Sequence, residues 1–337
     1  MKFRNFHAIH LLGCFLFYPF ISCTNEVAKD TPPENEKKSE AKVLSREASA
    51  GSQLLTDGSQ YEGEMLSGLP NGHGKKSFAN GDDYEGQFRK GLRHGHGTHR
   101  YKADDLLERY VGMWSNDEWD GYGKLVLKDG SRVVGKWNRS RLNYGDYEGS
   151  DGEVRSGKWA GNWDMLNEGF FKNSYGTEFS GIFNQQGEYD NGYIKKPNGD
   201  RYIGEFYNNA YHGKGILEKL DGTLYVGDFS QNVYEGVGVL KENDGSVYSG
   251  QFVEGLPHGY GIQKDTSGVG YTGNWINGLK DGIGTIDFGD GSSFVGQFSD
   301  GLAVDGQYDW GDGRISNAYQ DRMVTGWTGN LSLVSNI

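Results

Sequence analysis

The sequence has little of what stabilises most chains of its length. Its 337 residues include only two cysteines and six prolines, and apolar residues make up 35%. Two cysteines cannot form the disulfide framework that supports many exported folds. No free thiol remains if Cys14 is cleaved off and the thiol of Cys23 is modified. The low apolar content also argues against a thick two-layer core over the whole chain.

Basic residues are scarce as well. Lysine and arginine contribute 34 residues against 46 aspartates and glutamates, which gives a formal net charge of −12. Phosphate backbones and anionic lipid surfaces are bound through clusters of Lys and Arg, so the composition argues against nucleic acid as a partner. The best local exception is a short basic strip with Arg89, Lys90, Arg93 and Arg100.

Glycine and aromatic residues are abundant instead. The chain contains 55 glycines, and its 21 tyrosines, 17 phenylalanines and 8 tryptophans make up 14% of the residues. Disordered chains lack aromatic residues, so this composition predicts a folded chain. It is typical of a thin β-sheet in which large flat side chains supply most of the buried area.

One 23-residue unit is repeated through most of the sequence. Its clearest copies begin Tyr202-Ile-Gly-Glu-Phe206 and Tyr225-Val-Gly-Asp-Phe229. The same frame gives eleven copies; ten carry an aromatic residue two positions after the central glycine, and eight carry a later glycine, usually as Gly-x-Gly. A fixed period of this kind indicates a repeat architecture. The central glycines are Gly63, Gly86, Gly112, Gly135, Gly157, Gly181, Gly204, Gly227, Gly250, Gly273 and Gly296.

Each unit is predicted to form a β-hairpin. Most copies contain Asp-Gly or Asn-Gly, such as Asp221-Gly222, where we expect a type I′ turn with positive φ at both residues. Alternate strand residues share a face, so Tyr202, Gly204 and Phe206 project together and a ring can cover a glycine of the next strand. Successive hairpins predict an all-β fold: an elongated, single-layer antiparallel sheet of about twenty-two strands, solenoid-like, twisted and curved.

The unit closely resembles the MORN repeat (membrane occupation and recognition nexus), whose pattern is Tyr-x-Gly-x-Phe/Trp, Gly-x-Gly and a turn glycine. The resemblance covers residues 57–307. It implies a one-layer ribbon with a concave aromatic face, acting as a scaffold, a self-association module or an attachment beside membranes. After Gln307 the period fades, so we expect eleven repeats at 55–307 and a C-terminal cap at 308–337.

Two adjacent copies depart from the pattern. Val133 and Arg155 replace the leading aromatic residue, and Asp146 and Glu168 replace the later glycine. Aromatic residues gather in this stretch, and clustered Trp and Tyr favour contacts with proteins or sugars, so we expect a ligand surface here. The alternative is that the decayed repeats bend the ribbon and the rings repack. The candidate residues are Trp137, Tyr144, Tyr147, Trp159, Trp163, Phe170 and Phe171.

The N-terminus is typical of a secretory signal. Lys2 and Arg4 precede a largely apolar segment at 8–21 that is too short and interrupted to span a bilayer well. Residues 20–23, Phe-Ile-Ser-Cys, resemble a bacterial lipoprotein lipobox, with Phe20 in place of the usual leucine. The resemblance implies a signal peptide at 1–22 and lipidation of Cys23; the alternatives are an ordinary cleaved signal and an uncleaved anchor. Residues 23–54 have the composition of a flexible tether.

The sequence contains no recognisable catalytic or metal-binding motif. His73, His94, His96 and His99 are close in sequence, but histidines in or beside Gly-x-Gly favour a structural role. The chain has no zinc-protease spacing, P-loop frame or Gly-x-Ser-x-Gly elbow. We therefore expect no catalytic residue, metal or cofactor.

These patterns predict a non-enzymatic, exported lipoprotein anchored at the outer membrane or periplasmic face rather than the inner membrane. Its sheet is expected to be a scaffold for another envelope or host protein, and self-association is a further expectation. The alternatives are carbohydrate or peptidoglycan binding along the aromatic groove, and lipid binding for membrane attachment.

Overall fold

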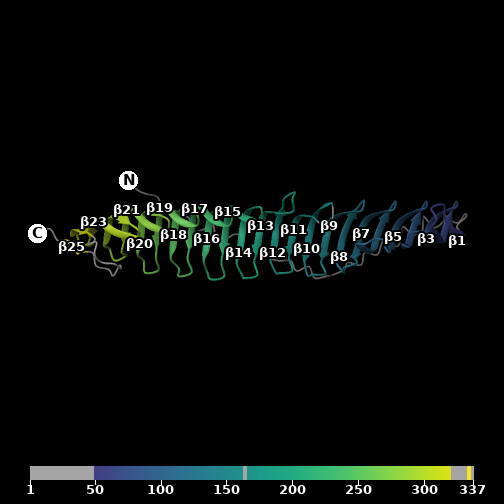
Figure 1. The fold of residues 1–337 in the computed structure, drawn as a ribbon, viewed down its shortest axis with the longest axis horizontal. Coiled ribbons are helices and arrows are strands. Elements are labelled where there is room, and N and C mark those ends of the chain that lie inside the picture. Colours follow the sequence, from purple (N-terminus) through teal and green to yellow (C-terminus); the bar gives the residue numbers. More distant parts are fainter. Residues whose placement is uncertain (1–48, 162–164, 320–331, 335–337) are drawn as a thin grey trace, which may run out of the picture. The chain divides into compact units, whose positions relative to one another are not determined.

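The computed structural model describes residues 49–161, 165–319 and 332–334, which form one sheet of 25 strands without a helix (Figure 1). Each strand pairs in antiparallel fashion with the strand that follows it in the chain, as Figure 1 shows from β1 to β25. The predicted single-layer antiparallel sheet of consecutive hairpins is confirmed. Within these described ranges, no helix has the length and hydropathy of a membrane span.

The strands are short and regularly spaced. Their bounds are β1 Ser49–Leu54, β2 Gln60–Leu66, β3 Leu69–Ser77, β4 Asp83–Arg89, β5 Leu92–Arg100, β6 Leu107–Ser115, β7 Glu118–Leu127, β8 Arg132–Asn138, β9 Arg141–Glu148, β10 Val154–Gly161, β11 Leu166–Lys172, β12 Glu178–Phe183, β13 Tyr189–Lys195, β14 Arg201–Tyr207, β15 Ala210–Glu218, β16 Leu224–Ser230, β17 Val233–Lys241, β18 Val247–Val253, β19 Leu256–Lys264, β20 Gly270–Ile276, β21 Leu279–Asp287, β22 Ser293–Ser299, β23 Leu302–Asp309, β24 Ile315–Tyr319 and β25 Ser332–Val334.

Aromatic rings cover glycines on one face of the sheet, which we call the aromatic face. The Tyr202 ring of β14 lies against Gly215 of β15, where an added Cβ atom would overlap the ring. Gly215 pairs directly with Gly204, and the Tyr202 hydroxyl donates to the Glu205 carbonyl at 2.8 Å. The expected packing of a ring on glycine is therefore confirmed. The same hydroxyl bond occurs at Tyr61, Tyr84, Tyr110, Tyr225, Tyr248 and Tyr271.

Successive repeats contact one another through these rings. Tyr202 meets Phe206 of its own repeat and Phe229 of the next nearly edge-on, with ring centroids 5.1 and 5.2 Å apart. Tyr211 stacks on Tyr202 at 3.9 Å. Such edge-on and stacked pairs stabilise a sheet beyond the area they bury. The series runs from Tyr61 to Trp137 and again from Phe179 to Phe298.

The opposite face, which we call the open face, carries the residues that alternate with the rings. In β14, Tyr202 and Phe206 are buried, whereas Ile203 and Glu205 between them are exposed. The contrast is large, because Tyr202 is 1% exposed and Ile203 is 48% exposed. The aromatic face is therefore the core of the protein, and the open face is the surface that a partner can reach.

The Gly-x-Gly segments form β-bulges. Gly204 pairs with Gly215, but Glu205 pairs with His212, which leaves two extra residues in β15. One of them, Gly213, has a φ of 55°, in the left-handed region that glycine adopts without strain. The Lys214 amide freed by the bulge donates to the Glu205 carboxylate at 3.3 Å. An acidic or amide residue after the central glycine thus satisfies a backbone group that the bulge leaves without a strand partner.

Two-residue turns join the strands at one edge of the sheet. Asn208 and Asn209 connect β14 to β15 with φ values of 50° and 60°. Positive φ at both positions is what a type I′ turn requires, and asparagine tolerates it better than most residues. The same pattern occurs at Ser67-Gly68, Lys90-Gly91, Asn116-Asp117, Arg139-Ser140, Gln231-Asn232, Glu254-Gly255, Asn277-Gly278 and Asp300-Gly301.

The Asp-Gly and Asn-Gly pairs that precede the leading aromatic residue, such as Asp221-Gly222, lie at the other edge, and the prediction of a type I′ turn there is wrong. Between β15 and β16, Gly222 has a φ of 94° whereas Asp221 does not have positive φ. The Gly222 amide donates to the Lys219 carbonyl at 3.0 Å, and the Lys219 amide donates to the Thr223 carbonyl at 2.9 Å. These bonds close a three-residue loop, whose additional residue removes the need for a second positive φ. Asp221 instead accepts the Thr223 amide at 2.9 Å.

The two ends of the sheet differ from the expected boundaries. The tether was expected to reach residue 54, but Ser49–Leu54 forms β1 and pairs with β2. Backbone pairing with an open strand edge requires no aromatic residue, so the repeat pattern gives no sign of it. Residues 23–48, including Cys23, lie outside the described residues. In the expected cap at 308–337, β24 and β25 continue the sheet.

The packing of rings on glycine predicts a specific cost for adding one methyl group. We expect Gly238→Ala to lower the free energy of unfolding by about 2–3 kcal/mol, because the Cβ atom would overlap the Tyr225 ring. Gly270→Ala is the matched control, since the nearest atom to its Cβ would be 3.7 Å away. Urea unfolding followed by circular dichroism measures both, and equal effects of the two substitutions would contradict the packing argument.

Candidate binding surface

The structure buries two of the candidate aromatic residues at 137–171. Trp137 of β8 and Trp159 of β10 lie on the aromatic face and are only 1% and 4% exposed. Their indole N–H groups donate to the Gly123 and Gly145 carbonyls at 3.2 and 2.9 Å. Both tryptophans are therefore core residues, in the position that Phe206 occupies in its repeat.

Two more candidates, Tyr147 and Phe171, also lie on the aromatic face, beside Arg155. The Arg155 guanidinium lies 5.4 Å from the Tyr147 ring centroid and 5.9 Å from that of Phe171. Its Nε donates to the Glu153 carboxylate at 2.6 Å. Arg155 thus takes the place of the leading aromatic residue and makes cation–π contacts there. For these rings the structure describes repacking within the sheet.

The remaining candidates do not complete a common surface. Tyr144 is on the open face and is 62% exposed, and Phe170 is on the same face but half-buried. Trp163 lies outside the described residues. The seven candidates are therefore not brought together, because neighbouring strand residues such as Phe170 and Phe171 point to opposite faces.

A different group of side chains surrounds Tyr144. Strand register places Tyr122, Lys136, Tyr144, Lys158 and Glu168 in one row on the open face across β7–β11, and we call this row the tyrosine–lysine surface. Tyr122 and Tyr144 are 72% and 62% exposed. A shallow hollow beside Tyr144 is also lined by Asn143 and Ser156.

Sequence reasoning did not select Tyr122, Lys136 or Lys158. A signal was present, because Tyr122 is the middle residue of Gly121-Tyr-Gly123, a position that lies on the open face in regular repeats. A count of aromatic residues along the chain mixes residues of the aromatic face with residues of the open face and so hides this signal. The alternation of side chains along each strand assigns every residue to one face.

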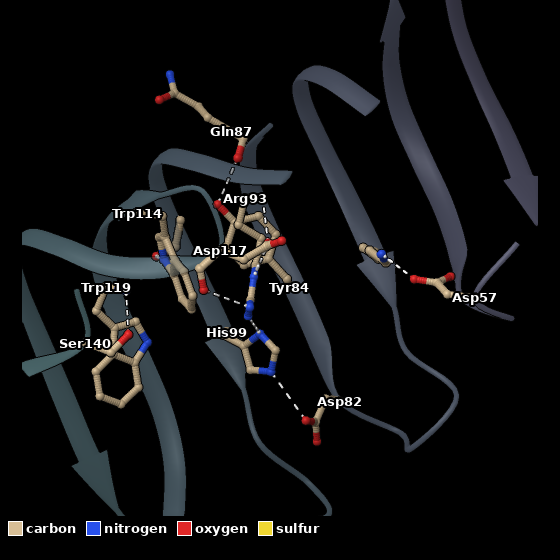
Figure 2. A network of polar contacts seen from close by, with 12 residues as sticks. Asp57, Asp82, Tyr84, Gln87, Arg93, His99, Trp114, Asp117, Trp119 and Ser140 are labelled. Carbon is tan, nitrogen blue, oxygen red and sulfur yellow. Dashed lines mark hydrogen bonds and ion pairs between the residues drawn. The ribbon is translucent and has the colours of Figure 1, made fainter. Parts of the chain in front are cut away.

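A partly buried polar network links the second repeat to its two neighbours (Figure 2). Arg93 of β5 donates to the Asp117 carboxylate through Nε at 2.9 Å, and its Nη1 contacts His99 Nδ1 at 2.8 Å. His99 Nε2 contacts the Asp82 carboxylate at 3.4 Å. His99 is 4% exposed and Asp82 is 7% exposed. In Figure 2 the four side chains follow one another from Asp117 to Asp82.

The geometry fixes the protonation of His99. An arginine can only donate, so Nδ1 accepts and the single proton of the neutral ring is on Nε2, which donates to Asp82. Burial and the nearby Arg93 charge hold the pKa of His99 below its usual value. Both ring nitrogens are occupied inside the protein, so His99 is not free to act as a general base.

The network holds an insertion in place. Asp82 accepts the backbone amides of Lys102 and Ala103 at 2.7 and 3.2 Å, at the point where the repeat period is lengthened. Burial alone would raise the pKa of Asp82, but these amides, together with Asn80 and His99, lower it overall. The role of the network is therefore to anchor the loop between β5 and β6.

The other histidines of the described residues do not gather into a metal centre. His73 and His96 lie on the open face in Gly-x-Gly segments, paired with Gln87 and Met113. In the part of the chain that the structure describes, no three His, Cys, Asp or Glu side chains are grouped as metal ligands.

His99 predicts a pH dependence of stability. Because its pKa is lower in the folded protein than in the unfolded chain, its stabilising contribution is complete above about pH 6.5 and declines as the pH falls below that value. We expect the melting temperature to fall as the pH is lowered from 7.5 to 5. His99→Leu should make the melting temperature depend less steeply on pH. Leucine is the matched replacement, since Leu217 and Leu240 occupy the same repeat position. Thermal unfolding monitored across this pH range is the measurement, and an unchanged slope would contradict the role of His99.

The solved structures that this chain matches have low sequence identity to it. The wild-type TCP10 domain of Danio rerio CPAP, in complex with a peptide of Danio rerio STIL, is 13% identical, with 77% of this chain and 98% of that chain covered and a TM-score of 0.20. The SAS-4 (dCPAP) TCP domain of Drosophila melanogaster, in complex with a proline-rich motif of Ana2, is 12% identical, with 52% and 86% covered and a TM-score of 0.21. No conclusion about function follows from these alignments, because both identity and TM-score are low. No curated protein matches this chain.

The family model for the MORN repeat matches seven segments. They are residues 61–83, 84–105, 110–132, 202–223, 225–247, 248–269 and 271–293. The stretch without a match, between residues 132 and 202, contains the two repeats in which Val133 and Arg155 replace the leading aromatic residue. The matched segments have the hairpins and the rings packed on glycine described above, and the chain is therefore a MORN-repeat protein.

Proposed function

We propose that the protein is a scaffold that binds another protein through the tyrosine–lysine surface. One observation carries this proposal: the aromatic face is filled by its own packing, whereas Tyr122 and Tyr144 on the open face are 72% and 62% exposed. Tyrosine is enriched at protein interfaces because its large, rigid ring also carries a hydroxyl. Lys136, Lys158 and Glu168 supply polar contacts around the two rings.

The proposed scaffold is not an enzyme and uses no cofactor. MORN repeats and a single-layer sheet are typical of non-catalytic proteins. The buried acid–base pair of Asp82 and His99 supports this proposal, since the pair is fully engaged in holding a loop.

The proposed partner is an envelope or host protein, met at a membrane surface. The support is the N-terminal sequence, in which a short apolar segment ends in Phe-Ile-Ser-Cys and Cys23 is the proposed lipid attachment site. Lipidation would place the protein at the outer membrane or periplasmic face. One acyl chain alone binds membranes only weakly, so stable anchoring requires more than one chain.

Carbohydrate is the second candidate ligand for the same surface. Tyr122 and Tyr144 are separated by one strand that carries Lys136, which places the two rings about 10 Å apart at the usual strand spacing. Exposed rings in a row can stack on sugar rings. Lys136 between them and Lys158 beyond Tyr144 fit an acidic glycan such as peptidoglycan.

Removal of the two exposed rings tests the proposed function. We expect the double variant Tyr122→Ala/Tyr144→Ala to lose a partner that wild type retains stoichiometrically from solubilised envelope, with β-sheet circular dichroism unchanged. Tyr175→Ala/Tyr207→Ala is the matched control, since these tyrosines are 85% and 57% exposed elsewhere. Equal retention by all three proteins would contradict the proposal. Release of the ligand by soluble peptidoglycan fragments would instead establish the carbohydrate alternative.

Lipid attachment is tested separately. We expect Cys23→Ser to move the protein from the membrane fraction to the soluble fraction and to abolish labelling by a palmitate analogue. Cys14→Ser is the control, because it is the other cysteine of the chain and lies within the apolar segment. Labelling of the Cys23→Ser protein would rule out Cys23 as the attachment site.

A further inference from the structure

The open face carries a mainly apolar row over β14–β22, away from the tyrosine–lysine surface, in which six of nine residues are isoleucine or valine and three are serine or threonine. Strand register pairs each member of the row with the next, from one strand to its neighbour. We call this row the apolar stripe, and it consists of Ile203, Ile216, Val226, Val239, Ser249, Ile262, Thr272, Thr285 and Val295.

The isoleucines and valines of the stripe are exposed, and the stripe is confined to one part of the sheet. Its isoleucines and valines are between 40% and 51% exposed. The same row near the start of the sheet carries Glu62, Lys75 and Glu85, the charges expected of a solvated face. Single exposed apolar residues are common, but contiguous apolar surface with a polar rim marks an interaction site.

The stripe, taken together with the residue on each side of it in every strand, has the size of a stable interface. Nine strands at about 4.8 Å spacing extend about 40 Å, and three alternate residues per strand extend about 20 Å, giving roughly 800 Å². This is about the area that each partner contributes to an interface of standard size.

The charges beside the stripe are self-complementary. In β14, Arg201 and Glu205 lie on the two sides of Ile203 and have opposite charges. In β15, Glu218 and Lys214 lie on the corresponding two sides of Ile216, with the charges reversed. All four charged residues are exposed.

We infer that the apolar stripe binds a second copy of this chain, face to face, about a two-fold axis that runs along the stripe. Such an axis sets each strand against the same strand of the other copy. The residue on one side of the stripe then faces the residue on the opposite side of the stripe in the other copy; we call these two flanking rows the rims. Arg201 then faces Glu205 of the other copy, and Glu218 faces the other Lys214. Further along, Lys264 faces the exposed ring of Tyr260, a favourable cation–π pair.

A second two-fold axis would also place the stripe of one copy on the stripe of the other. The charges of the rim residues decide between the two axes. With the axis along the stripe, no strand from β14 to β22 brings two like charges together. An axis parallel to the central strand β18 would instead set Lys241 against Lys264 and Glu218 against Asp287, and like charges across an interface are unfavourable. The tyrosine–lysine surface takes no part in either arrangement.

Cross-linking tests the axis directly. In a full-length chain with Cys14 and Cys23 replaced by Ser, we expect Val239→Cys to link to itself through a short bismaleimide, because stripe residues face their own symmetry mates. Val237→Cys, beside the stripe, should link to Lys241→Cys of a second chain more efficiently than to itself. Val134→Cys is the matched control, since it lies in the same row outside the stripe with 47% exposure.

Two outcomes would overturn the inference. One is equal self-linking of Val134→Cys and Val239→Cys. The other is that Val237→Cys links to itself more efficiently than to Lys241→Cys.

Sedimentation of the same full-length background supplies a second test. We expect a dimer that Val239→Lys weakens by about tenfold or more and Val134→Lys leaves unchanged. A monomer at all concentrations would overturn the inference, while partner capture by that monomer through Tyr122 and Tyr144 would still support the proposed function. A dimer that captures no partner would support the inference and contradict the proposed function.

Discussion

The whole sheet depends on the contact between a tyrosine ring and a pair of glycines on neighbouring strands. The Tyr202 ring can lie on the backbone only because Gly204 and Gly215 lack a Cβ atom, and its hydroxyl then reaches the Glu205 carbonyl. The ring fixes the register of one hairpin, and its edge contacts the aromatic residue of the next repeat. A single-layer sheet has no second layer to bury its residues, so the rings supply a core that lies within one face.

This use of the rings decides which surface remains for function. Residues that pack on glycine are buried on the aromatic face, which makes Trp137 and Trp159 part of the fold. Where Val133 and Arg155 replace the leading ring, the aromatic series is interrupted, but Arg155 restores contacts with Tyr147 and Phe171. The residues that vary without disturbing the core are those of the open face. There the sheet presents two distinct surfaces, one with tyrosines and lysines and one with an apolar stripe.

Sequence reasoning succeeded for features set by local periodicity and failed for those that require register. It predicted the sheet of consecutive hairpins and the rings on glycine, since each depends on residues at fixed spacing. It assigned the wrong turn type to Asp221-Gly222, because the choice between two-residue and three-residue loops depends on how the strands pair. It also grouped seven aromatic residues by position, and the structure separates six of them onto opposite faces, with Trp163 outside the described residues.

The sequence by itself determined the repeat, the strand alternation and the identity of the ring positions, because these follow from spacing along one chain. Only the tertiary structure decided which residues of different repeats become neighbours. Tyr122 and Tyr144 lie in one row, and Ile203 and Val239 in another, through strand pairing that brings distant residues side by side. Arg93, His99 and Asp82 form one network for the same reason. The bulge between β8 and β9 shifts this pairing by one residue, and a shift of one residue changes the face that a side chain occupies.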